Sequence, residues 1–334
     1  MIPRHTTLKD VAWKSGVSLS TVSAVLGGNA DALRISGKTR EKVLKTAKTL
    51  DYIPNGTARA MRQKKSSSVG LIMAKNPLSR YLPDPLLFGI LDELERINLH
   101  LTIGILPDEK LTSVFEFPKI MREWYTDGFL FNYISNAPVG TFEIIDNFKI
   151  PSVWMNCKKE YDCVYPDDYG GAKKAVRYLV NLGHKRIAYV KFGHSDHYSV
   201  NDRKNGYIDA MTDSGLKPEE YYFGVSSHDY LSCAERLLTA KHIPSAIICY
   251  GNEIDVLMYV AAIKGIKIPD DLSLLTFGLS GKTAYGIEIS VMKIPFYEIG
   301  ISSVQILVEK MKNPSKSFSK KEIKYGESEG KTCV

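Results

Sequence analysis

The stretch from Thr6 to Leu26, TTLKDVAWKSGVSLSTVSAVL, predicts two short helices joined by a tight turn. A candidate N-cap at Thr7 opens the first helix, and Gly16 is expected to end it. Ser18 can cap the second helix. In both halves apolar residues recur at the i, i+3, i+4 spacing of one helix face: Leu8, Val11 and Ala12, then Val22, Val25 and Leu26. The other face of the second helix carries uncharged hydrogen-bonding side chains and is narrow enough to enter a DNA major groove.

A third amphipathic helix is predicted from about Lys38 to Leu50. Its apolar residues again share one face: Val43, Leu44, Ala47 and Leu50. These side chains can close a three-helix core over the first two helices. Pro54 ends this region, and a very short helix is expected over residues 56–62. Lys64, Lys65 and the three serines that follow form a polar linker.

The positive charge is concentrated at the amino-terminal end. The chain of 334 residues carries a formal net charge of +7. Residues 1–65 contain thirteen Lys and Arg but only four Asp and Glu, which gives +9 there and about −2 in the remainder. Such a basic segment suits a polyanionic partner, because phosphates that it neutralises release their counterions.

From Ser68 onward, short apolar runs alternate with amphipathic segments. The apolar runs are candidates for buried strands: residues 69–74, 99–106, 127–133, 151–156, 186–192, 245–251 and 272–278. The clearest helix patterns cover residues 85–98, 169–183 and 202–215. This alternation is typical of parallel sheets covered by helices on both faces, whose ligands bind beyond the carboxyl ends of the strands.

Several other classes of protein find no support. Met1 to His5 is not followed by an apolar run, and no segment approaches roughly 18 apolar residues, so we expect no secretory signal, no membrane span and a cytoplasmic, nucleoid-associated location. The five cysteines are irregularly spaced, and we expect reduced thiols, no metal site and no cofactor. Motifs for nucleotide phosphates, for a nucleophile elbow or for a catalytic metal are missing, so no enzyme activity is expected.

At this point the chain resembles the LacI/GalR family of bacterial transcription regulators. The matching segments run in family order through nearly the whole chain: TLKDVAWKSGVS, STVSAVL, ISGKTREKVL, YIPNGTARAM, LGHKRIAYV and DLSLLTFG. The resemblance implies an all-α helix-turn-helix domain over residues 1–52, a hinge helix and linker over 53–67, and an effector-binding and dimerisation core over 68–334.

The implied core has two doubly wound α/β parallel-sheet subdomains, similar to periplasmic sugar-binding proteins. One covers about 68–165 plus 295–315, and the other about 166–294 plus the carboxyl-terminal tail. The chain is expected to cross between them near Pro166 and Pro295, and again in its last part.

The resemblance also implies which residues of the second helix read DNA. Leu19, Ser20 and Ala24 fall on variable reading positions, and Ala24 replaces a frequent arginine. Asn29 stands in for an asparagine that is usual just past this helix. Further contacts to phosphates or base edges would come from Thr7, Ser18, Thr21, Ser23, Tyr52 and Asn55.

In the implied hinge helix, Ala58 and Met61 share one face, and Met61 would act as an apolar wedge between base pairs in the minor groove. Arg59 would bind a nearby phosphate. So short a helix is unstable alone, and we expect it to fold only when two hinges pair on DNA.

The resemblance further implies an effector site between the two subdomains. Arg203, in NDRKNGY, would bind paired hydroxyls or a carboxylate of the effector. The other candidate effector contacts are Asn132, Tyr133, Trp154, Asn156 and Asn252. Asp168 fits a helix cap better than a ligand contact. Gly251 and Gly278 stand where the family places polar sugar contacts, so either an unusual effector or a degenerate pocket is expected.

The function that follows is that of a homodimeric repressor. It would bind a palindromic operator in double-stranded DNA and respond to a small carbohydrate-type effector. An alternative is a regulator with a degenerate pocket that is controlled by a protein corepressor. A solute-binding protein or an enzyme is a remote alternative. The tail from Ser315 to Val334 has no leucine heptads, so a tetramer is not supported.

Overall fold

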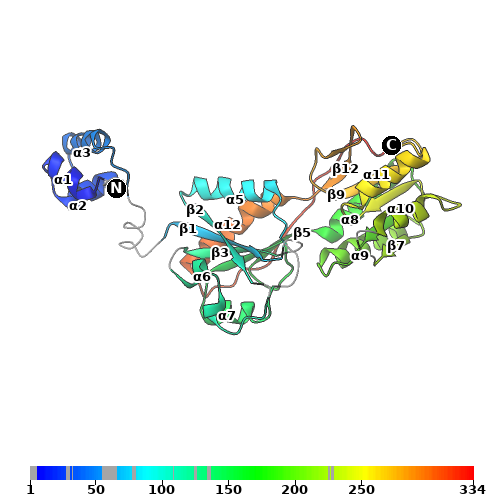
Figure 1. Ribbon diagram of the computed structural model, residues 1–334, viewed down its shortest axis with the longest axis horizontal. Coiled ribbons are helices and arrows are strands. Elements are labelled where there is room, and N and C mark those ends of the chain that lie inside the picture. Colours follow the sequence, from blue (N-terminus) through cyan, green and yellow to red (C-terminus); the bar gives the residue numbers. More distant parts are fainter. Residues whose placement is uncertain are drawn as a thin grey trace. The chain divides into compact units, whose positions relative to one another are not determined.

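The computed structural model divides the chain into two compact units, Met1–Ser66 and Ser67–Val334 (Figure 1). The structure describes residues 6–27, 31, 33–54, 66–76, 80–107, 109–123, 126–133, 137–224, 226 and 229–334. The predicted hinge helix lies outside these described residues, and so do five of the predicted DNA contacts: Asn29, Asn55, Ala58, Arg59 and Met61. None of the described helices is long and apolar enough to cross a membrane.

The first unit contains α1 (Leu8–Ser15), α2 (Leu19–Leu26) and α3 (Gly37–Thr49). Thr7 caps α1, because its Oγ1 accepts from the Asp10 amide at 3.3 Å while Asp10 Oδ2 accepts from the Thr7 amide at 2.8 Å. Gly16 ends α1 in the left-handed region, at φ 66°. Ser18 Oγ accepts from the Thr21 amide at 3.1 Å and starts α2. The two predicted caps and the predicted stop are therefore confirmed.

The three helices share a small apolar core. Its buried side chains are Val11, Val22, Val25, Val43 and Ala47. The prediction that α3 closes this core is confirmed for Val43 and Ala47, which lie one turn apart on the same face. It is wrong for Leu44, which is 47% exposed, because the residue after Val43 is turned about 100° away from that face.

The second unit begins with an all-parallel sheet in the order β13-β5-β4-β3-β1-β2. Its strands are β1 (Ser68–Ala74), β2 (His100–Leu106), β3 (Gly128–Asn132), β4 (Ser152–Met155), β5 (Cys163–Pro166) and β13 (Lys321–Ile323). One face packs against α5 (Asp84–Arg96) and α12 (Phe296–Lys312). The other face packs against α6 (Lys119–Arg122), α7 (Thr141–Asn147) and a short 3-10 helix (Val114–Glu116).

A second sheet follows in the order β14-β12-β9-β8-β6-β7, and only β14 is antiparallel to its neighbour. Its strands are β6 (Ile187–Phe192), β7 (Glu219–Phe223), β8 (Ala246–Cys249), β9 (Ser273–Gly278), β12 (Ser290–Lys293) and β14 (Ser328–Glu329). Helices α8 (Asp168–Asn181) and α9 (Ser199–Asp213) cover one face, and α10 (Tyr230–Leu238) and α11 (Glu253–Lys264) the other (Figure 1). A small hairpin joins β10 (Thr283–Ala284) to β11 (Ile287–Glu288).

The chain passes between the two sheets three times. The first two passages lie at the predicted positions, after Pro166 at the end of β5 and at Pro295 before α12. The third lies between β13 and β14. Residues 321–323 therefore pair in the first sheet, which corrects the expectation that the whole tail belongs to the second subdomain.

Helices α5 and α12 approach closely at two glycines. A Cβ atom built on Gly89 would clash with the backbone carbonyl of Tyr297, and one on Gly300 would lie 2.6 Å from the Leu86 carbonyl oxygen. Backbone atoms cannot rotate away as a flexible side chain can. This contact therefore requires glycine on both helices.

The substitution Gly89→Ala is expected to lower the free energy of unfolding, because overpacking usually costs about 1–3 kcal/mol and the clash here is with backbone atoms. This loss should exceed the gain of about 1 kcal/mol that alanine brings to an unstrained helix. Thermal unfolding of the full chain measures the change. Gly37→Ala is the control, because its added Cβ meets nothing within 4 Å. A stabilised Gly89→Ala protein would contradict the close contact.

Candidate DNA-binding face and ligand-binding cleft

A cluster of hydroxyls marks the amino-terminal end of α2. Ser18, Leu19 and Ser20 are exposed, with Leu19 at 42%. Ser18 Oγ lies 2.7 Å from Ser20 Oγ and 2.8 Å from Thr21 Oγ1, so the three hydroxyls form one hydrogen-bonded group. Hydroxyls and free backbone amides at a helix N-terminus can bind phosphate oxygens or base edges. Ser23 is half-buried further along α2.

Two of the predicted DNA contacts are placed differently from expectation. Ala24 is only 7% exposed, because its methyl group lies on the side of α2 that packs into the core. It cannot serve as an exposed reading residue, and this part of the prediction is corrected. Tyr52 packs partly against the same core. Thr7 is exposed, but its hydroxyl donates to Asp10 at 2.7 Å as part of the α1 cap.

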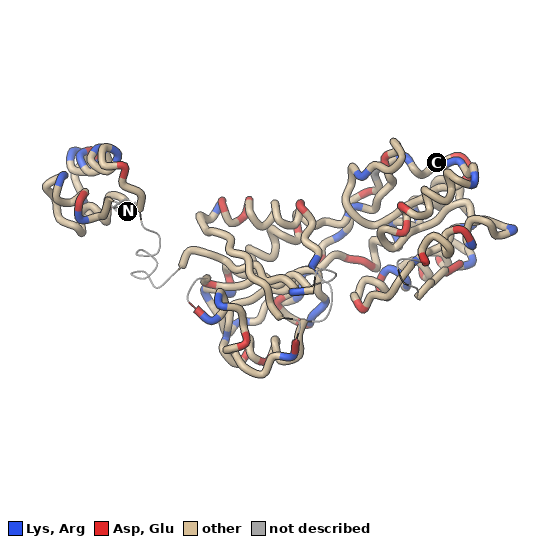
Figure 2. The backbone as a smooth tube through the Cα atoms, in the orientation of Figure 1, with Lys and Arg blue, Asp and Glu red and all other residues tan. Residues whose placement is uncertain are grey.

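The described part of the first unit is strongly basic along α3. Figure 2 shows Lys and Arg crowded on this helix, where the sequence has five basic residues and one acid: Lys38, Arg40, Lys42, Lys45 and Lys48, with Glu41. Such a row can neutralise phosphates without reading sequence. The unit thus combines an uncharged hydroxyl face on α2 with a basic helix.

The second unit contains a cavity of about 400 Å³ at the carboxyl ends of the second sheet's strands. It is lined by residues at the ends of β6, β8 and β9 and at the start of α9 and α11. Asn156, which follows β4, and Phe296, which begins α12, line it from the elements of the first sheet. The cavity is therefore a cleft between the two sheets, where α/β folds of this type bind ligands.

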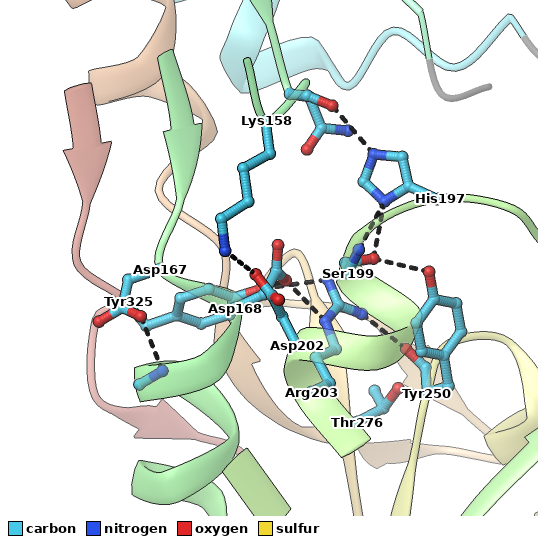
Figure 3. Close-up of polar contacts among 12 residues, drawn as sticks. Lys158, Asp167, Asp168, His197, Ser199, Asp202, Arg203, Tyr250, Thr276 and Tyr325 are labelled. Atoms are coloured by element: carbon cyan, nitrogen blue, oxygen red, sulfur yellow. Dashed lines mark hydrogen bonds and ion pairs between the residues drawn. The ribbon is translucent and has the colours of Figure 1, made fainter. Parts of the chain in front are cut away.

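Arg203 lies in this cleft and is held on three sides (Figure 3). Its Nε donates to Asp168 Oδ1 at 2.7 Å, Nη1 to the Tyr250 carbonyl at 2.9 Å and Nη2 to the Tyr325 hydroxyl at 3.1 Å. Its guanidinium carbon lies 4.8 Å from the centroid of the Tyr250 ring. These contacts fix the orientation of the guanidinium and leave two of its five N–H groups for a ligand.

Asp168 is a partner of this arginine and not the helix cap that the sequence predicted. Asp167 caps α8 instead, because its Oδ1 accepts from the Gly170 amide at 2.7 Å. Asp168 also accepts from the Tyr325 hydroxyl at 2.6 Å. Burial raises the pKa of Tyr325 well above its usual value, so the hydroxyl keeps its proton and donates it.

A chain of hydrogen bonds connects the end of β4 with Tyr250 (Figure 3). His197 Nε2 lies 2.9 Å from the Asn156 carbonyl oxygen, and Nδ1 lies 2.7 Å from Ser199 Oγ. Burial lowers the pKa of His197, so the ring is neutral at pH 7. Because a carbonyl only accepts, Nε2 carries the proton and Nδ1 accepts from Ser199. The Tyr250 hydroxyl, 2.8 Å from Ser199 Oγ, then donates to Ser199.

The cleft contains only half of the predicted effector contacts. Arg203, Asn156 and Asn252 line it. Asn132, Tyr133 and Trp154 do not: all three are at most 2% exposed inside the first subdomain. This corrects the prediction for these residues.

Each of these residues has a structural role instead. Trp154 stacks on Phe131 at a centroid distance of 4.3 Å, beneath α7. The Tyr133 hydroxyl donates to the Leu106 carbonyl. The Asn132 amide donates to the Tyr81 carbonyl at 2.6 Å and so supports a residue that does line the cleft.

The sequence analysis did not predict two charged residues of the cleft, Lys191 and Glu253. It also did not predict the chain of hydrogen bonds through His197 and Ser199. Lys191 ends an apolar strand and Glu253 begins a helix, and neither position carries a signal before the fold is known. The glycines noted in the sequence are here: a Cβ on Gly278 would meet nothing within 4 Å, and one on Gly251 only Glu253 Oε2 at 3.6 Å. The cleft is therefore open on that side.

A helix-turn-helix unit joined to a two-sheet core with a cleft defines a DNA-binding transcription regulator. Residues 7–55 match the family model of bacterial regulatory proteins of the lacI family, and residues 176–333 match a periplasmic binding protein-like domain. The chain therefore combines a helix-turn-helix domain of the lacI family with a periplasmic binding protein-like domain.

The curated relatives that match this chain over most of its length are named as regulators. Catabolite control protein A of Priestia megaterium is 27% identical over 317 residues, which cover 92% of this chain and 93% of that protein. The transcriptional regulator DegA of Bacillus subtilis is 28% identical, with 81% of each chain covered. The structure of a lac repressor dimer bound to operator and an anti-inducer is similar in fold, with a TM-score of 0.78, 20% identity and coverage of 99% and 100%.

Proposed function

We propose that this regulator is a repressor that binds a palindromic operator as a homodimer and responds to a small effector of carbohydrate type. The observation that carries the proposal is the presence in one chain of two sites. The hydroxyl face of α2 suits DNA, and the cleft with its oriented Arg203 suits a small polar ligand.

A homodimer is supported by apolar side chains exposed along α5 and the edge strand β2. They are Phe88 at 54%, Leu91 at 39%, Ile103 at 52% and Ile105 at 37% exposure. Exposed apolar groups of this size on neighbouring elements are typical of protein interfaces. A twofold dimer would also match the symmetry of a palindrome.

The effector would act by changing how the two subdomains are arranged, because the cleft lies between their sheets. A ligand held by Arg203 and Asn252 on one side and Asn156 on the other favours one separation of the subdomains. It can shift DNA affinity only by its differential affinity for the two arrangements. We propose no catalytic activity for this regulator, and we expect it to act on DNA in the cytoplasm.

The first test is selection of bound sequences from random double-stranded DNA with the full chain. The expected result is an enriched palindrome whose affinity falls steeply with salt, because phosphate contacts release counterions. Affinity for the enriched DNA should then change when the effector is added. Failure to enrich any sequence would contradict sequence-specific binding.

Ser20→Ala tests the α2 face. Loss of one hydroxyl contact to a base edge is expected to weaken operator binding by about 0.5–1.5 kcal/mol, the net value of one hydrogen bond. Fluorescence anisotropy with labelled operator measures this. Thr49→Ala, at an exposed position of α3, removes a hydroxyl whose one hydrogen bond to the described residues is to the Lys45 carbonyl, and this change should leave binding unchanged. Equal effects of both substitutions would argue against reading by α2.

Control by a protein corepressor remains the second candidate, and the open side of the cleft at Gly251 and Gly278 favours it. The two candidates differ in one respect. A corepressor would change operator affinity without any small molecule in the cleft, and substitutions of Arg203 would then have no effect on regulation.

A further inference from the structure

Lys191 is a buried cation that the sequence did not reveal as part of the cleft. It is 4% exposed at the end of β6 and lines the cavity. Its Nζ donates to the carbonyls of Phe192 at 3.1 Å and Gly193 at 3.0 Å. An ammonium has three N–H groups, so these bonds leave one. Lysine is almost never buried without an ionic partner, yet among the described residues no carboxylate lies within ion-pair distance of this Nζ.

The acids near the cleft are already occupied by other groups. Glu253 is the one carboxylate among the described residues that line the cavity, and it accepts from the backbone amides of Phe192 at 3.1 Å and Gly251 at 2.6 Å. Asp168 is bound to Arg203 and Tyr325 and does not line the cavity. The lining therefore carries two cations with remaining N–H groups against one carboxylate, whose oxygens already accept from backbone amides and whose pKa is raised by burial.

Both cations lie close to the same aromatic ring, that of Tyr250. Lys191 Nζ and the Arg203 guanidinium carbon each lie 4.8 Å from the centroid of Tyr250. Both cations therefore border the part of the cleft at Tyr250, which itself lines the cavity. Burial lowers the pKa of Lys191, so its charged form is stabilised less than in water and would gain from a bound anion.

We propose that the effector carries an acidic group, a carboxylate or a phosphate, and that this group binds between Lys191 and Arg203. The inference rests on the proposed function and specifies the ligand class of the same cleft. The rest of the ligand would lie against Tyr81 and Phe296, whose rings pack edge to face at 6.1 Å. A cavity of about 400 Å³ suits a sugar acid or a sugar phosphate.

Isothermal titration of the full chain with matched ligands tests this proposal. The pairs are D-glucose with D-glucuronate and D-galactose with D-galacturonate, and D-glucose 6-phosphate separates phosphate from carboxylate recognition. At least one acidic compound is expected to bind on the order of 10–100-fold more tightly than its neutral partner, the value of a hydrogen bond to a charged group. Neutral sugars binding as well as their acids would overturn the inference and leave the effector-controlled regulator intact.

Three variants locate the acidic group. Lys191→Met is expected to remove most of the preference for the acid, whereas Lys191→Arg should retain it. Lys185→Met, on the exposed surface, changes the net charge equally and should bind like the parent protein. Thermal unfolding without ligand shows whether Lys191→Met is folded. A folded Lys191→Met protein with undiminished preference would overturn the proposal. If no compound of either class binds while the operator is still bound, both the inference and effector control by a carbohydrate fail, and DNA binding stands.

Discussion

Replacement of Asp168 by alanine is expected to destabilise the second unit by about 3–5 kcal/mol. Arg203 is 8% exposed and Asp168 fully buried, so the change leaves a buried guanidinium without its counter-charge. The Tyr325 hydroxyl would lose its acceptor as well. The orientation of Arg203 in the cleft should be lost together with stability, and effector binding should weaken even in molecules that remain folded.

Calorimetric unfolding of the full chain, with and without effector, measures both effects. Asp202→Ala is the matched control, since it also removes an aspartate paired at 2.7 Å, with Lys158, but both side chains there reach solvent. A loss of at most about 1 kcal/mol is expected for that pair. A similar loss of unfolding free energy in the two variants would show that burial does not determine how much the Arg203–Asp168 pair contributes to stability.

The second large effect is expected in the hinge. Met61→Gly should weaken binding to the selected operator by on the order of 10–100-fold, because an apolar wedge between base pairs contributes a few kcal/mol through the bend that it supports. Binding to unrelated DNA should stay nearly unchanged, since that binding depends on phosphate contacts. This prediction rests on the sequence, as Met61 lies outside the described residues.

Anisotropy titrations on operator and random DNA provide the comparison for Met61→Gly. Met61→Leu retains an apolar side chain of similar size and should bind the operator like the parent chain. A parallel loss on both DNAs would exclude a role as a wedge.

Much of the fold could be predicted because it depends on local chemistry. Caps at Thr7 and Ser18 and the glycine stop at Gly16 act within one helical turn. The seven predicted strands are all present, with ends within about two residues of those predicted, since each combines an apolar run with clear flanking breaks. The strands that were missed are short or lie at sheet edges, and β7 exposes alternate charged and aromatic residues.

The cleft could be predicted only in part, because its composition depends on which strand ends meet. Asn156 lies just past β4 with a left-handed φ of 51° and reaches the cleft, whereas Trp154, two residues earlier, is covered by α7. From the sequence alone, an aromatic residue near a strand end can equally well line a cleft or be buried beneath a helix.

Four features could be predicted from the amino-acid sequence: the helix-turn-helix, the basic amino-terminal end, the alternation of strands and helices, and Arg203 as a cleft residue. The first three follow from periodicity, capping and charge, which neighbouring residues carry, whereas Arg203 follows from the family resemblance of its NDRKNGY segment. Long-range packing, in contrast, sets the pairing of Asp168 with Arg203, the burial of Ala24 against the core, and the place of Lys191 and Glu253 in the same cleft. Those contacts join residues far apart in the chain, and their burial and charge balance exist only after the two sheets have packed.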